Sequence, residues 1–379
     1  MSVLITFVAA VFVFSAVIAI HEFGHFAVAK LCGIQVNEFS IGMGPVLWKK
    51  VRKGTQYSIR ALPVGGFVAL EGEESPESQQ AETARAEEAG STPEEPEKTP
   101  AVAEEPAEKP VGIPLNEAPV WQRALVMVAG AAMNFLLGFV VMMILIAAQN
   151  EPITSRVIYK VEDGALCGQT GLQAGDKVLA VNGRKCFVAN DMLYELMRTE
   201  DYAASFTVLR DGEKVELPRV QFDTWQDDSG ETHMSLGFTV YGIRKTPLNV
   251  LKEAGNSVLY YGRIIFTSLM DLLRGRESIN DLSGPVGIVT AIGQAASYGW
   301  QDLLELLVLI TVNLGIFNLL PFPALDGGKV VFLLIEGITG HAVPEKLQGS
   351  LTVAAFVLLF GLMIFATYND ILRLITGAV

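Results

Sequence analysis

The sequence predicts a polytopic α-helical membrane protein with four transmembrane helices, a membrane-associated β region and one soluble α+β module. Half of the 379 residues are apolar, which is high for a soluble domain. The segment between the second and third apolar runs alternates apolar and polar residues, as half-buried strands do. The apolar residues gather in four uncharged runs whose lengths approach or exceed the span of a bilayer: residues 3–20, 124–148, 306–325 and 350–368.

The net charge of −13 is concentrated in one segment. Residues 71–110 carry 13 Glu against Arg85, Lys98 and Lys109. Because this segment holds almost no large apolar side chain, it cannot bury enough surface to offset its ordering entropy, and we expect a disordered acidic insert. The remainder of the chain has no basic stripe that could neutralise phosphates, which argues against a nucleic-acid partner.

Two segments are predicted to be rich in strands. Residues 32–70 read as short strands separated by Gly-rich turns. Residues 152–241 show alternating runs with turns at Asn182-Gly183 and Asp211-Gly212, and a short helix around 191–198.

These features predict six regions. The boundaries are 1–70 for the first transmembrane helix and the β region, 71–112 for the acidic insert, 113–150 for the second transmembrane helix, 151–242 for the soluble module, 243–302 for an amphipathic helical linker, and 303–379 for the third and fourth transmembrane helices.

His21-Glu22-Phe23-Gly24-His25 has the pattern H-E-x-x-H. Two histidines four residues apart on a helix lie about 40° apart around its axis, so both imidazoles can reach one Zn²⁺. Glu22 lies slightly further around the helix, where it can accept a proton from water at the metal. The alternative is a pair of interior histidines beside a stray carboxylate. The motif sits in an apolar helix, where ionisable residues are costly and usually functional, and this favours the metal site.

A catalytic zinc needs a third protein ligand, and Asp326 is the best candidate. It follows the third apolar run and precedes Gly327 and Gly328, which allow close approach of the backbone. Alone, Asp326 would be read as a helix-capping residue; together with the histidine pair it is predicted to be a ligand. The other histidines, His233 and His341, lie in polar stretches and are expected to be solvated.

The motifs described above resemble the site-2 proteases, in particular the bacterial regulator-of-sigma-E protease type. Three motifs match the family in the same order along the chain: the H-E-x-x-H motif, Gly284-Pro-Val-Gly287 and the run from Asn318 to Gly328. It implies one Zn²⁺ per chain, held by His21, His25 and Asp326, with Glu22 as the catalytic base. It also implies that Asn318 polarises or positions the substrate near the zinc.

The soluble module resembles a PDZ domain of the bacterial protease type. Residues 171–178 (GLQAGDKV) and 181–183 (VNG) match the corresponding PDZ run. A PDZ domain can bind a peptide by adding it as a strand, or in this family it can exclude large substrates by size; the sequence leaves both roles open.

Two features depart from the family pattern. The second apolar run reads Ala129-Gly-Ala-Ala-Met-Asn134 where relatives have a proline at position 131, and the absence of that proline is expected to straighten the helix. The acidic insert after Leu70 is also unusual.

We expect the protein to cleave single-span membrane proteins, such as anti-sigma factors or signal-peptide remnants. A transmembrane helix must unwind before its peptide bonds can be attacked, and unwinding in lipid leaves backbone groups unpaired. The stretch ending at Gly65-Gly66-Phe67 is predicted to supply a strand edge for those groups, and the family resemblance supports a β-loop that enters the membrane there.

The distribution of Lys and Arg predicts the orientation in the cell membrane. Basic residues crowd the connection between the first two runs, which should therefore be cytoplasmic, and the PDZ-like module should lie outside the cytoplasm. The residues concerned are Lys30, Lys49, Lys50, Arg52, Lys53, Arg60 and Arg123.

Two other function classes remain open at this point. Intramembrane His and Asp also occur in ion or metal transporters, although no inverted repeat is visible. A PDZ scaffold with a decayed active site is the second alternative, and the intact Glu22 argues against it. The three cysteines form no CxxC pair, which argues against a thiolate zinc site, and whether Cys167 and Cys186 pair is left open.

Overall fold

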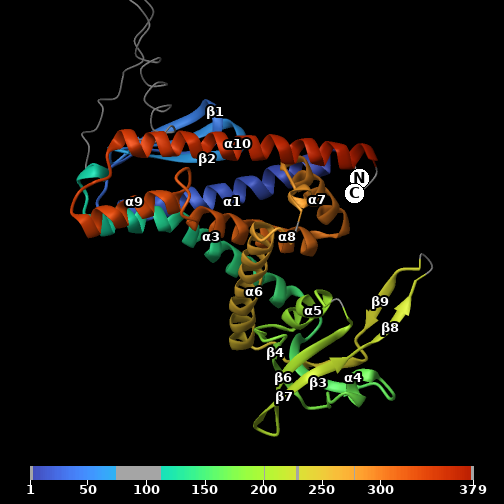
Figure 1. Ribbon diagram of the computed structural model, residues 1–379. Coiled ribbons are helices and arrows are strands. Elements are labelled where there is room, and N and C mark those ends of the chain that lie inside the picture. Colours follow the sequence, from blue (N-terminus) through green and yellow to red (C-terminus); the bar gives the residue numbers. More distant parts are fainter. Residues whose placement is uncertain (1–2, 74–111, 200, 228–229, 277, 377–379) are drawn as a thin grey trace, which may run out of the picture. The chain divides into compact units, whose positions relative to one another are not determined.

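The computed structural model describes residues 3–73, 112–199, 201–227, 230–276 and 278–376, so most of the predicted acidic insert lies outside the described residues. The chain divides into two compact units. One comprises Met1–Gly138 and Ser268–Val379, and the other comprises Phe139–Thr267. The two units are helical and α/β in character, respectively (Figure 1).

Four helices are long and apolar enough to cross a membrane: α1 (Val3–Leu31), α3 (Val120–Ala148), α8 (Trp300–Leu319) and α10 (Glu345–Thr376). They contain the four predicted apolar runs. The third run, residues 306–325, was expected to be broken near its end by Pro321 and Pro323, and this is confirmed: α8 ends at Leu319, because these prolines cannot continue the helical hydrogen-bond ladder. The helix α3 is continuous through Ala131.

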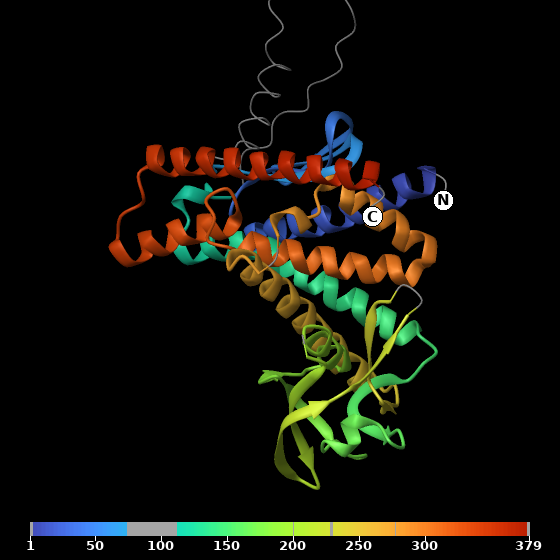
Figure 2. The ribbon, with the colours of Figure 1, turned by 45° about the vertical axis from the view of Figure 1, so that its right-hand side comes forward.

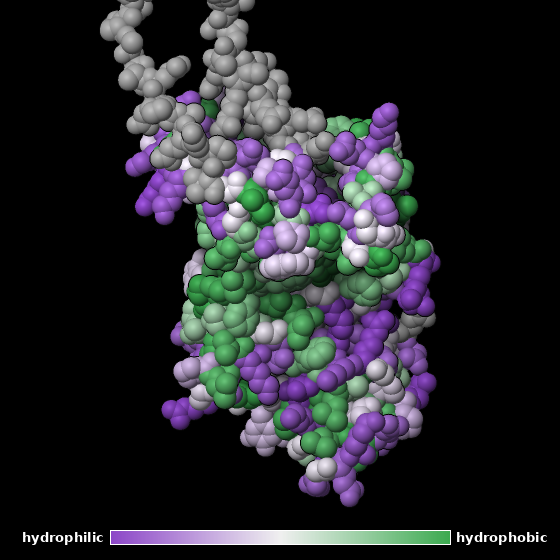
Figure 3. Space-filling view, turned by 90° about the vertical axis from the view of Figure 1, so that its left-hand side faces the viewer, coloured by the Kyte–Doolittle hydropathy of each residue, from purple (hydrophilic) through white to green (hydrophobic). Residues whose placement is uncertain are grey.

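Large apolar side chains cover much of the outer surface of the helical unit. They are concentrated on α1 and α10, and the face drawn in Figure 3 shows hydrophobic residues gathered in a broad patch. A soluble monomer rarely exposes so much contiguous apolar surface, whereas lipid would cover it. Strongly exposed examples are Val3, Phe7, Val353, Phe356, Val357, Leu358 and Phe360.

Shorter helices complete the helical unit: η1 (Leu115–Glu117), η2 (Ile279–Asp281), α7 (Pro285–Tyr298) and α9 (Asp326–Thr339). The N-terminus of α7 is held by a buried carboxylate on α10. Asp370 is 3% exposed and accepts the backbone N–H groups of Gly284 at 3.1 Å and Gly287 at 2.7 Å. A Cβ atom on Gly284 would lie 2.8 Å from Asp370 Oδ2. The glycines of the Gly-Pro-Val-Gly motif therefore allow the start of α7 to lie close to Asp370 on α10.

The residues between α1 and the insert form two long strands, β1 (Val36–Arg52) and β2 (Thr55–Leu70), joined by a tight turn at Lys53-Gly54. The prediction of short strands ended by glycine turns was wrong in detail, because the glycines lie within the strands and bend them. Residues 38–41 pair with 66–69 on one side and with 56–59 on the other. Figures 1 and 2 both show α10 running beside these strands.

The α/β unit contains a six-stranded sheet. Its strands run in the order β10-β3-β4-β6-β7, with β5 paired to β4, and β8 and β9 form a separate hairpin. The elements are β3 (Ile153–Val161), α4 (Leu166–Gln169), β4 (Lys177–Val181), β5 (Arg184–Lys185), α5 (Ala189–Met197), β6 (Ala203–Arg210), β7 (Glu213–Gln221), β8 (Asp223–Gln226), β9 (Thr232–Ser235), β10 (Phe238–Ile243) and α6 (Pro247–Leu273).

Both turns predicted in this unit are confirmed as two-residue hairpin turns. Asn182-Gly183 joins β4 to β5 and Asp211-Gly212 joins β6 to β7, and all four residues have positive φ angles, between 50° and 88°. Such turns match the twist of the adjoining strands. The predicted short helix is also present, as α5.

The loop of the Gly-Leu-Gln-Ala-Gly-Asp motif is held by a buried ion pair. Asp176 is fully buried and receives two hydrogen bonds of 2.7 Å from the Arg210 guanidinium. It also accepts the backbone N–H of Gln173 at 2.9 Å. A bidentate pair satisfies both carboxylate oxygens, which is what allows this charge to be buried.

Cys167 and Cys186 belong to the apolar core of the α/β unit and are free thiols. Burial raises the pKa of both thiols, and that of Cys186 rises to about 12. A raised pKa lowers the thiolate fraction at neutral pH, and the thiolate is the reactive form.

We therefore predict that maleimide at neutral pH labels neither Cys167 nor Cys186 in the folded protein, and labels both after denaturation. A Cys32→Ser background removes the half-buried third thiol from the measurement. Intact-mass spectrometry before and after denaturation counts the adducts, and rapid labelling of either buried thiol in the folded state would contradict the prediction.

Candidate metal centre

His21 and His25 lie on one face of α1, as their spacing predicts. Each is 8% exposed, and their Nε2 atoms are 3.1 Å apart. His25 Nδ1 lies 2.8 Å from the backbone oxygen of Val126 on α3. Since a carbonyl can only accept, Nδ1 carries the proton, and the Nε2 lone pair is left free for a metal.

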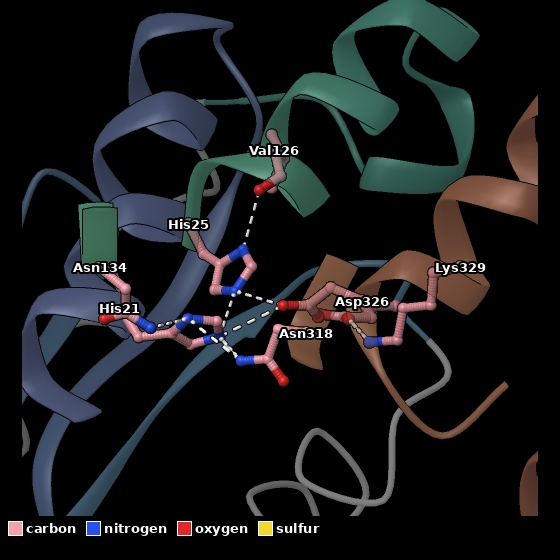
Figure 4. Close-up of polar contacts among 8 residues, drawn as sticks. His21, His25, Val126, Asn134, Asn318, Asp326 and Lys329 are labelled. Carbon is pink, nitrogen blue, oxygen red and sulfur yellow. Dashed lines mark hydrogen bonds and ion pairs between the residues drawn. The ribbon is translucent and has the colours of Figure 1, made fainter. Parts of the chain in front are cut away.

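Asp326 is the first residue of α9, and its carboxylate turns towards the histidines (Figure 4). Its Oδ2 atom lies 3.2 Å from His21 Nε2 and 3.3 Å from His25 Nε2. The alternative role as a helix cap does not match the structure, because Leu325 is the N-cap residue and no side chain caps the helix. A Cβ atom on Gly327 would lie 2.2 Å from the backbone oxygen of Leu320, and one on Gly328 would lie 2.2 Å from that of Phe322. The two glycines therefore let the loop after α8 pack against the start of α9.

The three atoms fit a zinc site. Two nitrogens and one oxygen form a triangle with sides of 3.1 to 3.3 Å, close to the separation of about 3.3 Å between ligands in a tetrahedral site with bonds of about 2 Å. Asp326 Oδ2 is buried, and its near partners among the described residues are the two Nε2 atoms, 3.2 and 3.3 Å away. Where these nitrogens offer lone pairs rather than protons, a cation at the centre of the triangle would satisfy the carboxylate and both rings.

The helix α3 closes one side of the site. A Cβ atom on Gly130 would lie 2.4 Å from His25 Nε2 and 2.6 Å from His21 Cε1, and one on Gly24 would lie 2.4 Å from the Ala129 oxygen. The two helices therefore meet backbone to backbone beside the imidazoles. Asn134, one turn after Gly130, is fully buried, and its amide nitrogen lies 3.2 Å from His21 Nδ1.

Three residues of α3 beside the histidines, Val126, Gly130 and Asn134, were not predicted to belong to the site. They stand at intervals of four residues, which places them on one face of α3. This spacing, the small residues around it and the partial match of Ala129–Asn134 to the family pattern were the signals in the sequence. They show that one stripe of the second span faces a neighbour, but not that the neighbour is the histidine pair.

The strand segment predicted to bind substrate lies beside Glu22. A Cβ atom on Gly66 would lie 3.7 Å from Glu22 Cγ and 2.9 Å from the Ser40 oxygen. Gly65 has a φ angle of 97°, which favours glycine. Earlier in the same strand, the Pro63 backbone oxygen accepts a hydrogen bond from Ser15 on α1. The segment therefore runs along α1 from Ser15 towards Glu22. Phe67 follows Gly66 in the strand.

Asn318 lies in the last turn of α8 and is half-buried. Its amide nitrogen is 3.5 Å from both ring nitrogens of His21. This equal spacing places the amide beside the ring rather than in line with one lone pair.

The remaining histidines lie outside this cluster. His341 is exposed and lies 3.0 Å from the Thr339 oxygen. His233 is on β9, 3.1 Å from an Asp227 oxygen, and its ring contacts Trp225. Together with Glu231 these residues form an exposed to half-exposed polar group, as is common on protein surfaces.

Comparison with known proteins agrees with this arrangement. Peptidase family M50 matches residues 9–362. The zinc metalloprotease RasP of Shouchella clausii is 32% identical over 99% of this chain and 100% of its own length. The regulator of sigma-W protease RasP of Bacillus subtilis is 29% identical over 97% and 99%. A putative zinc metalloprotease of Clostridium perfringens is 33% identical over 96% and 97%.

The family match covers most of the chain, and the relatives align along nearly their whole length. A metal-binding motif within an apolar helix, in a chain with four candidate spans, agrees with the chemistry in their names. The chain belongs to peptidase family M50 and is an intramembrane zinc metalloprotease of the site-2 type.

Proposed function

We propose that His21, His25 and Asp326 hold the catalytic zinc of this protease. The proposal depends on one observation, the convergence of two Nε2 atoms and one carboxylate oxygen to within 3.3 Å. Zn²⁺ bound there supplies Lewis acidity, which polarises a carbonyl group and lowers the pKa of water. Held by these three residues, zinc would have a position open for substrate or water.

In this proposal Glu22 transfers the proton. It adjoins a ligand on the same helix, and its side chain lies against the strand segment at Gly66. A carboxylate in this position can accept a proton from attacking water and pass it to the leaving amine. Asn318 at the end of α8 is suited to donate an amide hydrogen bond to the substrate carbonyl.

The substrate is proposed to bind as an added strand. Residues 66–70 pair with β1 on one side, which makes them an edge segment of this small sheet in the described part of the chain. An unwound peptide could pair its backbone groups there while its scissile bond faces Glu22. Gly65, Gly66 and Phe67 would then form the part of this edge nearest the site.

Single-span membrane proteins are the proposed substrates, for example anti-sigma factors or remnants of signal peptides. One matching relative is named for regulation of sigma-W. The alternatives, a transporter and an inactive scaffold, are less well supported, because Glu22 is intact and the matching relatives are named as proteases.

We propose further that the α/β unit is a PDZ domain on the extracytoplasmic side of the cell membrane. Its support is the antiparallel sheet, the two-residue turns and the loop held by Asp176. In the sheet order β10 is an edge strand, and this position favours peptide addition over a purely steric role.

The first test is Glu22→Gln, which removes the proton acceptor but keeps the size of the side chain. We expect zinc content and thermal stability to match the parent, while cleavage of a single-span substrate in detergent falls about 10²- to 10⁴-fold. Exposed Glu345 on α10 provides the control Glu345→Gln, which should cleave normally. Full activity of Glu22→Gln would refute the proposed role of Glu22.

The second test is Gly130→Ala. The added methyl would lie 2.4 Å from His25 Nε2, so α3 or the imidazoles must move, and overpacking of this kind costs about 1–3 kcal/mol. We expect reduced zinc content and loss of cleavage. Gly361→Ala on α10 is the matched control, because no atom lies within 4 Å of its added Cβ. Normal zinc content in Gly130→Ala would contradict the observed packing of α3 on the histidines.

A further inference from the structure

Asn134 is a buried polar residue beside His21 that the mechanism above does not use. It lies on α3 with no exposed surface. Its amide nitrogen faces His21 Nδ1 at 3.2 Å, on the edge of the ring opposite Nε2, which faces Asp326 (Figure 4). Its Oδ1 atom is buried and has no hydrogen-bond partner among the described residues. An unpaired buried oxygen calls for a physical explanation.

The chemistry of the His21 ring explains the unpaired oxygen of Asn134. If His21 binds zinc through Nε2, that atom must offer a lone pair, so the ring proton must be on Nδ1. Nδ1–H then needs an acceptor, and an amide nitrogen cannot be one. A half-turn of the carboxamide about its Cβ–Cγ bond exchanges oxygen and nitrogen without changing its shape, and this places Oδ1 opposite Nδ1.

We propose that Asn134 is a positioning residue for His21: its Oδ1 accepts the Nδ1–H of the zinc-bound imidazole. The proposal rests on the ligand set given under the proposed function. It gives His21 the same kind of support that His25 receives from the Val126 oxygen at 2.8 Å. Both acceptors come from one face of α3, so a single helix sets the proton position of both imidazoles. Acceptors of this kind fix the orientation of a histidine ligand and raise its basicity.

The surroundings of Asn134 hold it in place. Thr311 on α8 is fully buried and donates its hydroxyl to the backbone oxygen of Asn134 at 3.2 Å. Nearby, Gly138 packs against Thr311 and Val312. Asn318 is less suited to be the acceptor, because its amide nitrogen is 3.5 Å from both ring nitrogens, farther than the 3.2 Å of Asn134 from Nδ1.

The test measures zinc affinity directly, by competition with a chromophoric chelator, on the full-length protein in detergent. Asn134→Leu removes the acceptor, and we expect zinc to bind about 10- to 100-fold more weakly. Asn134→Asp keeps an acceptor at the same position and should restore affinity to within about threefold, as is found for carboxylate–histidine–zinc arrangements. Asn369→Leu is the matched control, because it makes the same replacement on α10, where the amide contacts Asn280, and it should bind zinc normally.

Parent-like zinc affinity in Asn134→Leu would overturn the proposal. Equal weakening in the Leu and Asp variants would also overturn it, because the effect would then come from packing rather than from the acceptor. Elution volume and thermal unfolding check that the variants fold, and Asn134→Ala replaces the Leu variant if that one does not. His21→Ala distinguishes failure of the proposed ligand set from failure of the proposed role of Asn134. If this variant binds zinc as tightly as the parent, the ligand set is wrong, whatever the result for Asn134.

Discussion

The structure depends on the meeting of two imidazoles and one carboxylate inside an apolar helical unit. Burying ionisable groups away from water is costly unless they are paired or bind a metal. His21 and His25 come from the first helix, whereas Asp326 lies about 300 residues later in the chain. If these three side chains hold zinc as proposed, α1 and α9 must be held in position to within a few tenths of an ångström, because bonds of about 2 Å to zinc tolerate little error.

The helix α3 provides much of that precision. Its contacts with α1 are made by backbone and small residues, since Gly24 lies against the Ala129 oxygen and Gly130 against both imidazoles. Close approach of this kind is how membrane helices gain packing energy in the absence of a hydrophobic driving force. The same face presents the Val126 oxygen and the Asn134 side chain to the rings. One helix thus combines packing with control of the histidine protons.

The β1–β2 segment connects this centre to its proposed substrate. The strand lies along α1, with the Pro63 oxygen bonded to Ser15 and Gly66 beside Glu22. Within the segment, the buried Glu38 accepts hydrogen bonds from Ser58 at 2.7 Å and Arg60 at 2.8 Å. A satisfied internal charge gives the two strands a defined register, which a surface that pairs with an extended peptide requires.

The sequence by itself determined the features that depend on spacing within one element. Four uncharged runs predicted the long helices, the Asn-Gly and Asp-Gly pairs predicted two hairpin turns, and the H-E-x-x-H spacing placed both histidines on one face. Such spacings have fixed geometry, about 3.6 residues per helical turn and two per strand repeat. The context of Asp326 and the histidine pair, and then the motif resemblance, predicted Asp326 as the third ligand; this stays a proposal, which its distances to both imidazoles support.

Tertiary structure decided what depends on contacts between distant elements. It made Asp326 the start of a new helix, α9, which packs against the loop that follows α8. It bent β1 and β2 at their glycines, set Asp370 against the Gly-Pro-Val-Gly motif, and turned Gly130 and Asn134 towards the histidines. The physical reason is that local periodicity shows which face of an element is buried, whereas the residues that it meets there are chosen by the packing of the whole unit.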